Sequence, residues 1–291
     1  KFEMENLRKK VSLKHELGRA LLGEFTGTLL LCFIGLSVVA QSVLRDATKT
    51  GALGNEMIGI NAGFALAIAF GVAVTAKLSG GHINPAVSLM FVSFRQLAPV
   101  KFVLYLLAQT LGAFVGAALT YAIYHNAINA VDPTHTFKTA GIWASYPGNH
   151  LGNFNGFVDQ VLATAVFCFL IAHLTDKKNA YPSWAVPFLV GLSFFAIGAA
   201  FGFNCGYPCN PARDFGPRLL TLVMGYENVF SHKSWFWVPI VAPFVGALLG
   251  AWFYQFAIGF HTPADEVDKY VIVGATQQEM RPLAKEDGNE A

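Results

Sequence analysis

Long apolar stretches alternate with short polar segments along most of the chain. Five of these stretches contain no Asp, Glu, Lys or Arg, and they cover residues 25–44, 57–76, 102–131, 179–212 and 234–264. A helix needs about 20 mostly apolar residues to cross a bilayer. The pattern therefore predicts an all-α membrane protein with six transmembrane helices, near residues 20–44, 57–77, 101–124, 157–175, 184–203 and 236–260.

The composition supports the same class of protein. Of the 291 residues, 54% are hydrophobic and 13% are charged, whereas a soluble domain carries about 25% charged residues. Too few ionised groups remain to cover a water-facing globule of this size. A soluble enzyme, a nucleic-acid-binding protein and a disordered protein are therefore excluded as leading classes.

Four scattered cysteines, Cys32, Cys168, Cys205 and Cys209, do not form the pattern of a disulfide framework. Cys205 and Cys209 have C-x3-C spacing with no second pair nearby, which is a poor spacing for zinc. We expect four free thiols, no metal site and no cofactor.

The distribution of basic residues predicts the orientation in the membrane. Six spans place both termini on one side. With cytoplasmic termini, the cytoplasmic segments hold eleven Lys and Arg residues and the outer loops hold four, as the positive-inside rule requires. The chain then divides into a cytoplasmic N-terminal segment (1–19), a membrane domain (20–260) and a cytoplasmic tail (261–291). We expect no signal peptide, since the first apolar segment is too long, and a polar, mostly disordered tail.

The membrane domain contains an internal repeat, about 20–124 and 157–260. The tripeptide Asn-Pro-Ala occurs at 84–86 and again at 210–212, each time with a glycine four residues upstream. Each half has three spans, which is an odd number, so the two halves must have opposite orientations in the membrane. Inverted repeats of this kind are typical of membrane transport proteins.

Two further correspondences support the repeat. Glu24 on the first span corresponds to Gln160 on the fourth, and each is followed four residues later by threonine. Gly-x3-Gly-Ala ridges occur on the third span at 112–117 and on the sixth at 246–251. Close packing of helix backbones is sufficient to explain these ridges.

Each Asn-Pro-Ala triplet predicts the start of a helix. Proline is favoured at the first helical position, where its missing N–H has no cost, and asparagine is a strong N-cap residue. The resulting helices, 85–94 and 211–222, are too short to cross the bilayer. We expect half-helices that meet near the midplane, preceded by non-helical backbone at 78–83 and 204–209, which is tolerated there only if it is buried or lines a polar pathway.

Both triplets lie in longer motifs that resemble a known family. Residues 79–87 (SGGHINPAV) and 202–218 (GFNCGYPCNPARDFGPR) are similar to the signatures of the aquaporin (major intrinsic protein) family. Asp214, Arg218 and the pair 239–240 (PI) are typical of its glycerol-conducting branch, the aquaglyceroporins. The resemblance covers about 20–260 and implies an aquaporin-like channel domain with six transmembrane helices and two re-entrant half-helices.

The resemblance also implies a set of site residues. A selectivity filter would consist of Phe64, Gly198, Tyr207 and Arg213, with two aromatic walls, fixed donors on the arginine and extra space at the glycine. The pore motifs would be Asn84, Pro85, Ala86, Asn210, Pro211 and Ala212, with Asp214 as the marker of the glycerol branch and Glu24, Gln160 and His82 as supporting residues.

These residues imply a passive channel for glycerol and water that excludes ions and protons and that catalyses no reaction. The family commonly has a second glutamate where this chain has Gln160, whose amide oxygen we expect to accept hydrogen bonds from the second loop. His82 would line the inner mouth or anchor the first loop, and a mercurial would block at Cys205 or Cys209. The expected partners are glycerol, water and the lipid bilayer, with a homotetrameric assembly in the plasma membrane and no nucleic acid.

Other functions remain open from the sequence alone. A water-only channel of the same fold disagrees with Asp214 and Gly198. A secondary transporter would need coupling residues near the midplane, where the spans offer little besides Glu24. A non-conducting structural protein on this fold disagrees with the intact pore set. An intramembrane enzyme is the least favoured, since no catalytic constellation occurs within the spans.

Overall fold

The computed structural model describes residues 2–48, 56–263, 270–272 and 280–282. Its α-helices are α1 (Phe2–Val11), α2 (Glu16–Thr48), α3 (Glu56–Ser79), α4 (Pro85–Ser93), α5 (Pro99–Val131), α6 (Phe137–Ala140), α7 (Asn153–Thr175), α8 (Val186–Phe201), α9 (Pro211–Val223) and α10 (Val238–Ala257). Single 3-10 turns occur at Lys177–Asn179, His232–Ser234 and Gly259–His261. Two short strands follow, β1 (Tyr270–Ile272) and β2 (Met280–Pro282).

All six predicted spans are helices. Five of the described helical segments, those containing α2, α3, α5, α7 and α10, are long and apolar enough to cross a membrane. The fifth predicted span is the shorter helix α8, with 16 residues in place of the expected 184–203. It begins at Val186, and Pro187 lies in its first turn. Proline is favoured at the start of a helix, which explains the position of this N-terminus. Its length is about 24 Å.

Helix α5 differs most from its expected bounds. It continues to Val131, and Ile128 in its last turns is fully buried. The helix therefore extends seven residues beyond the predicted end of this span at residue 124, and the connection to α7 contains the short helix α6. Burial of an apolar side chain outweighs the polar composition of this segment.

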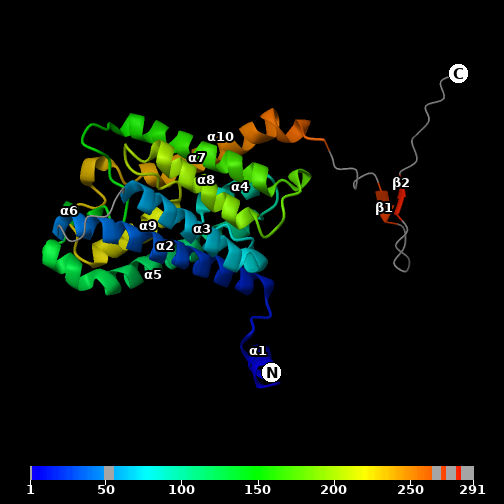
Figure 1. Ribbon diagram of the computed structural model, residues 1–291, viewed down its shortest axis with the longest axis horizontal. Helices are drawn as coiled ribbons and strands as arrows, with labels where there is room; N and C mark the ends of the chain where they lie inside the picture. Colours follow the sequence, from blue (N-terminus) through cyan, green and yellow to red (C-terminus); the bar gives the residue numbers. More distant parts are fainter. Residues whose placement is uncertain (1, 49–55, 264–269, 273–279, 283–291) are drawn as a thin grey trace.

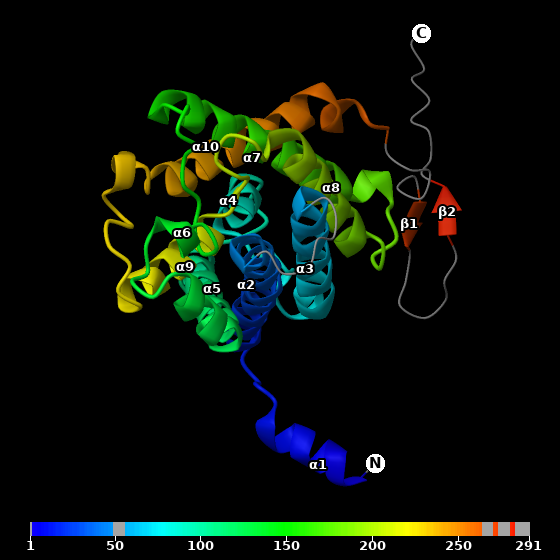
Figure 2. The same cartoon turned by 60° about the vertical axis from the view of Figure 1, so that its left-hand side comes forward.

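The two sequence repeats fold into matching halves. Helices α2 and α5 pack together in the first half, α7 and α10 pack together in the second, and α3 packs on α8 between the halves. The half-helix α4 lies near the centre, between α2 and α10 (Figure 2). Helix α2 begins and α10 ends at the same end of the bundle, on the right in Figure 1, as an even number of spans requires.

Glycines on the predicted ridges allow the closest helix contacts. A Cβ atom at Gly112 would overlap the backbone carbonyl of Phe25, and one at Gly246 would overlap that of Val161. The same relation therefore joins α5 to α2 and α10 to α7. The ridges pack helix backbones against each other, as the sequence predicts.

The tail forms a small antiparallel ladder outside the helical domain. Tyr270 pairs with Pro282 and Ile272 pairs with Met280. We expected a mostly disordered segment over 261–291. Two short parts of it are paired strands, and the other residues beyond 263 lie outside the described residues.

We predict that Gly250→Ala destabilises the protein by about 1–3 kcal/mol, because an added methyl group in a closely packed contact forces the backbones apart. At this position the Cβ atom would overlap the backbone of Ala165. Thermal unfolding of the detergent-solubilised protein measures the effect. Gly59→Ala is the matched control, since a Cβ atom there meets nothing within 4 Å. Equal stability of the two variants would contradict the packing role.

Candidate functional site

The two Asn-Pro-Ala triplets begin the half-helices α4 and α9. Asn84 has extended backbone angles, φ −156° and ψ 121°, and its Oδ1 accepts the N–H of Ala86 at 2.8 Å. Asn210 accepts the N–H groups of Ala212 and Arg213 at 3.1 and 3.2 Å. Both asparagines are N-caps with proline directly after them, so the predicted local structure is confirmed.

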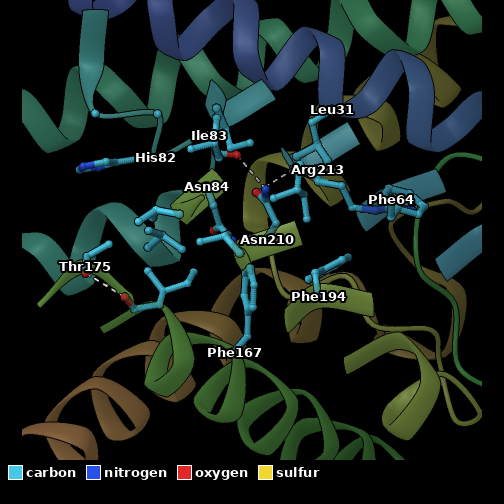
Figure 3. A pocket seen from close by; sticks show the side chains of 18 of the residues that line it. Leu31, Phe64, His82, Ile83, Asn84, Phe167, Thr175, Phe194, Asn210 and Arg213 are labelled. Atoms are coloured by element: carbon cyan, nitrogen blue, oxygen red, sulfur yellow. Dashed lines mark hydrogen bonds between the residues drawn. The ribbon is translucent and has the colours of Figure 1, made fainter. Parts of the chain in front are cut away.

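The side-chain amides of the same asparagines connect the two half-helices. Asn84 Nδ2 donates to the carbonyl of Cys209 at 2.9 Å, and Asn210 Nδ2 donates to the carbonyl of Ile83 at 2.9 Å. Ile83 and Cys209 both have a φ of +44°, a left-handed conformation that turns each carbonyl toward the other repeat. Each amide has two N–H groups, so one donor per asparagine remains for the cavity that both residues line (Figure 3).

A buried carboxylate holds the loop before α4. Glu24 accepts the backbone N–H of His82 at 3.0 Å through Oε1, and that of Ile83 at 2.7 Å through Oε2. Gln109 also donates to Oε2 at 2.7 Å. The side chain of Glu24 is fully buried, and these charge-assisted bonds compensate for its removal from water. The supporting position expected for Glu24 agrees with this geometry.

The loop before α9 is held differently, and the expected role of Gln160 as an acceptor is not observed. Its Nε2 donates to Asp159 Oδ2 at 2.8 Å and to the carbonyl of Gly206 at 3.2 Å, and it contacts Cys205 Sγ at 3.1 Å. Its Oε1 has no partner. The reason is the neighbouring carboxylate: Asp159 also accepts the amide of Asn204 at 2.8 Å, so the donor side of Gln160 must face it.

Phe64, Tyr207 and Arg213, three of the four residues predicted as a filter, meet at one end of the cavity. This end lies beside the loop between α5 and α7, and we call it the outer end. The guanidinium carbon of Arg213 lies 5.0 Å from the ring centroid of Phe64, and the rings of Phe64 and Tyr207 meet edge to face with centroids 6.4 Å apart. Gly198 lines neither this cavity nor the one on the other side of the filter. It lies behind Tyr207, where a Cβ atom would be 2.6 Å from Tyr207 Cζ, and Phe194 lines both cavities. The hydroxyl of Tyr207 donates to Asn61 Oδ1, so Tyr207 presents its ring to the cavity.

The outer loop between α5 and α7 completes this end of the cavity. The carbonyl of Trp143 accepts Arg213 Nη1 at 3.0 Å, and this fixes the direction of the guanidinium. Asn61, Trp143 and Ser145 were not identified from the sequence. Asn61 is a polar residue inside an apolar span, which was the available signal, whereas the contacts of the loop depend on its folded path.

Asp214 does not line the cavity. It fixes the position of the loop between α5 and α7. Its carboxylate forms a fully buried ion pair with Arg218 at 2.8 Å and accepts the N–H of Ser145 at 2.7 Å. Arg218 also contacts this loop, since it donates to the carbonyl of Ser145 at 2.7 Å. The charge of Arg218 is therefore neutralised next to the filter, and Arg213 has no such partner among its hydrogen bonds in the described structure.

A second carboxylate, outside the membrane-spanning helices, organises the start of the same loop. Asp132 accepts the backbone N–H and the hydroxyl of Thr136 at 2.8 and 3.0 Å and the hydroxyl of Thr139 at 2.8 Å. Burial alone would raise the pKa of Asp132, but these hydrogen bonds stabilise the carboxylate and the pKa is lowered. Asp132 therefore fixes the first turn of this loop, from Thr136 to Thr139.

Two cavities meet at the filter. The outer cavity, about 260 Å³, and the inner one, about 80 Å³, share four lining residues: Phe64, Phe194, Pro208 and Arg213. From there the inner cavity passes Asn84 and Asn210 and reaches His82 and Thr175 at its other end (Figure 3). The lining is mostly apolar, with polar groups at the filter, at the two asparagines and at the inner end.

His82 both lines the inner cavity and contacts α4. Its Nδ1 lies 3.1 Å from the hydroxyl of Ser88, and its ring stacks on Phe91 with centroids 4.5 Å apart. The two positions considered for His82 therefore coincide. All four cysteines are free and buried, as expected; Cys205 lines the outer cavity. Among the described residues, no group of three or more His, Cys, Asp or Glu side chains could hold a metal ion.

Comparison with known proteins identifies the family. The family model of the major intrinsic proteins matches residues 11–254, and the chain belongs to this family. It is 44% identical over 269 residues to "Aquaporin-10" of Milnesium tardigradum, covering 85% of this chain and 64% of that protein. It is 40% identical over 255 residues to "Aquaporin-10" of Homo sapiens, covering 85% of this chain and 83% of that protein.

The structure is similar to the crystal structure of the aquaglyceroporin from Plasmodium falciparum. The TM-score is 0.75 and the sequence identity is 33%, with 83% of this chain and 97% of that chain covered. The chain is thus a multi-pass membrane protein with the architecture of the family, six transmembrane helices and two re-entrant half-helices.

We predict that Gln160→Glu destabilises the protein by about 1–3 kcal/mol, because a second carboxylate would face Asp159 and the Gly206 carbonyl without a donor. Thermal unfolding at pH 7 measures the change. Asp159→Asn in the same chain should restore part of the loss, since it supplies an amide donor. A rise in stability for Gln160→Glu alone would show that the arrangement around Gln160 is wrong.

Proposed function

We propose that the protein is a passive channel that conducts glycerol and water through the cavity between its two repeats. The observation that carries this proposal is the position of the two free asparagine N–H donors, on Asn84 and Asn210, in a narrow and mostly apolar cavity. A neutral solute with hydroxyl groups can exchange water for these donors. The names and titles of the similar proteins support the same function.

The proposed selectivity filter consists of Phe64, Gly198, Tyr207 and Arg213. Arg213 offers fixed N–H donors to hydroxyl oxygens, while Phe64 and Tyr207 form an apolar wall for the carbon–hydrogen side of a polyol. The absence of a side chain at Gly198 leaves the ring of Tyr207 set back toward Asn61. The filter therefore fits a solute that is polar on one side and apolar on the other.

Exclusion of ions follows from the same geometry. Both half-helices point their N-termini at the centre, and each N-terminus carries about half a positive charge. Arg213 adds a full positive charge at the filter. A cation is therefore repelled at two positions, by Arg213 at the filter and by the half-helix N-termini at the centre. A permeant oxygen at Asn84 and Asn210 accepts hydrogen bonds from both amides, and this interrupts proton transfer along a water chain. No chemical bond is made or broken, so the proposed protein is not an enzyme.

The remaining proposed site residues are structural supports of this pathway. Pro85, Ala86, Pro211 and Ala212 form the first turns of the half-helices; Asp214, the marker of the glycerol branch, holds the outer loop. Glu24, Gln160 and His82 hold the re-entrant loops. The proposed domains are the N-terminal segment 1–19, the channel domain 20–260 and the tail 261–291.

We further propose that both termini are cytoplasmic and that the channel lies in the plasma membrane as a homotetramer. The excess of Lys and Arg, eleven against four, supports this orientation. The tetramer follows from the family to which the chain belongs, and in it each subunit would carry its own pore.

Solute flux into proteoliposomes tests the function. We expect both glycerol and water flux for the wild type, and loss of about 90% of the glycerol flux for Arg213→Val, because a charged hydrogen-bond donor contributes about 1.5–3 kcal/mol. Phe64→Ala should change the ratio of glycerol to water flux. Phe70→Ala is the matched control on the same helix, since Phe70 is 49% exposed on the outer surface and should have no effect.

Gly198→Ala tests the size of the filter separately. An added methyl group forces the ring of Tyr207 toward Arg213, so we expect glycerol flux to fall about tenfold with a smaller loss of water flux. Water flux without glycerol flux in the wild type would favour a water-only channel. Accumulation of solute against its gradient would favour a secondary transporter.

A further inference from the structure

An apolar groove lies on the outer surface of the bundle, behind the two half-helices. It has a volume of about 190 Å³; its floor includes Pro85 and Pro211, and its walls include Leu106 of α5 and Ile240 and Phe244 of α10. Helices α5 and α10 each pack on both α4 and α9, so the half-helices fill the space between the two spans. The groove is therefore open on the side away from the pore.

The depth of this groove is fixed by its floor. Pro85 and Pro211 are the first residues of the two half-helices, which meet where the asparagines bond across to the opposite repeat. That level is the middle of the membrane domain. A groove that faces outward at this depth is in contact with the hydrocarbon of the bilayer.

Water is a poor occupant of the groove. Thr110 is the polar side chain among its lining residues, and its hydroxyl already donates to the carbonyl of Leu106 at 2.8 Å. A buried water needs two to four polar partners. An acyl chain fills an apolar groove without that requirement.

A separate cavity of about 410 Å³, which we call the headgroup cavity, lies at the C-terminal end of α10. It is lined by Arg95 and Gln96, which follow α4, and by Trp252, Gln255 and Phe260. In the part of the chain that the structure describes, the exposed guanidinium of Arg95 has no hydrogen-bond or ion-pair partner. Aromatic side chains beside a basic group are typical of the level of lipid headgroups.

The backbone of Arg95 gives an independent reason to examine this residue. Its φ is +59°, and it follows the C-cap of α4, a position at which glycine is the usual residue. Arginine at this position directs a cation into the cavity at the cost of backbone strain. A glycine would fit the turn with less strain but would provide no charge.

The groove and the headgroup cavity lie along one face of α10. Ile240, Phe244, Trp252 and Gln255 follow helical spacing on one face, and the first and last are fifteen residues apart, a distance of about 22 Å. Half of the hydrocarbon thickness is about 15 Å, and the headgroup lies beyond it. One phospholipid of a single leaflet therefore matches the distance from the headgroup cavity to the groove.

We propose that this face of α10 binds one anionic phospholipid. Its phosphate is held by Arg95 with the amides of Gln96 and Gln255, and one acyl chain lies in the groove behind Pro85 and Pro211. The bound chain supports the outer side of the half-helices, opposite the pore. This proposal depends on the membrane-spanning fold and not on the solute that the pore conducts.

Native mass spectrometry of the full-length protein in detergent tests the headgroup site with phosphatidylglycerol and phosphatidylcholine at equal concentrations. Both lipids carry a phosphate, but only the headgroup of phosphatidylcholine also carries a compensating positive charge. We therefore expect phosphatidylglycerol to be enriched about fivefold, the effect of one basic side chain on a headgroup with net negative charge. Arg95→Gly should abolish the enrichment without loss of folding, since glycine fits the turn. Lys77→Gln is the matched control, because it removes one exposed basic charge at the same end of the bundle and should keep the enrichment.

Equal loss in Arg95→Gly and Lys77→Gln would show unspecific attraction of anionic lipid and would overturn the proposal. Competition by inorganic phosphate alone at millimolar concentration would also overturn it, since the site would then bind a free anion. Retained glycerol flux of Arg95→Gly in phosphatidylcholine vesicles separates this outcome from failure of the proposed channel function.

Photolabelling tests the acyl groove. A phosphatidylglycerol with a diazirine near the end of one acyl chain should label peptides of α5 and α10 around Leu106 and Ile240. Ile240→Trp, which fills the groove, should reduce this label severalfold. Uniform labelling of all outer helices, or cross-links from this face to a second copy of the chain, would overturn the proposal.

Discussion

Two hydrogen bonds at the centre of the molecule determine the position of most other functional groups. Asn84 donates to the carbonyl of Cys209 and Asn210 donates to that of Ile83, each at 2.9 Å. Half-helices of 9 and 13 residues have little stability by themselves. The reciprocal bonds fix the two N-termini against each other, and they leave one donor of each amide directed at the pore. The left-handed backbone conformation at Ile83 and Cys209 directs these two carbonyls toward the opposite repeat.

The support for this centre differs between the repeats. In the first, one buried carboxylate, Glu24, accepts two consecutive backbone N–H groups. In the second, the corresponding amide of Gln160 donates instead, to the carbonyl of Gly206. Ser145 of the loop between α5 and α7 also fixes this re-entrant loop, since its hydroxyl donates to the carbonyl of Cys205 at 2.7 Å, and it contacts Asp214 and Arg218 of α9. The second loop leads directly into α9, which carries the filter arginine, Arg213. Its position therefore depends on the outer loop as well as on the transmembrane helices, and a change in that loop reaches the filter directly.

The sequence predicted the fold because its strongest signals are local or repeated. Long apolar stretches predicted the six helices, and the proline and asparagine of each triplet predicted the half-helices within one residue of their observed ends. Most of the contacts that the sequence did not predict join distant parts of the chain. The orientation of Gln160 depends on Asp159 next to it and on Asn204 in a distant loop, and the hydroxyl of Tyr207 reaches Asn61 across 146 positions of sequence. Such pairings depend on tertiary packing, which residue type alone does not specify.

The scarcity of charge in the membrane domain has a specific consequence at the filter. Arg213 and Arg218 lie five positions apart on α9, and one carboxylate, Asp214, lies between them. Asp214 forms an ion pair with Arg218 at 2.8 Å, and both side chains are fully buried. Arg213 is left with the neutral carbonyl of Trp143 and the face of Phe64. Had Asp214 paired with Arg213, the positive potential at the narrowest point would be cancelled and a cation would meet a weaker barrier. The i,i+4 spacing of Asp214 and Arg218 on the helix prevents this exchange and preserves one unpaired positive charge at the filter.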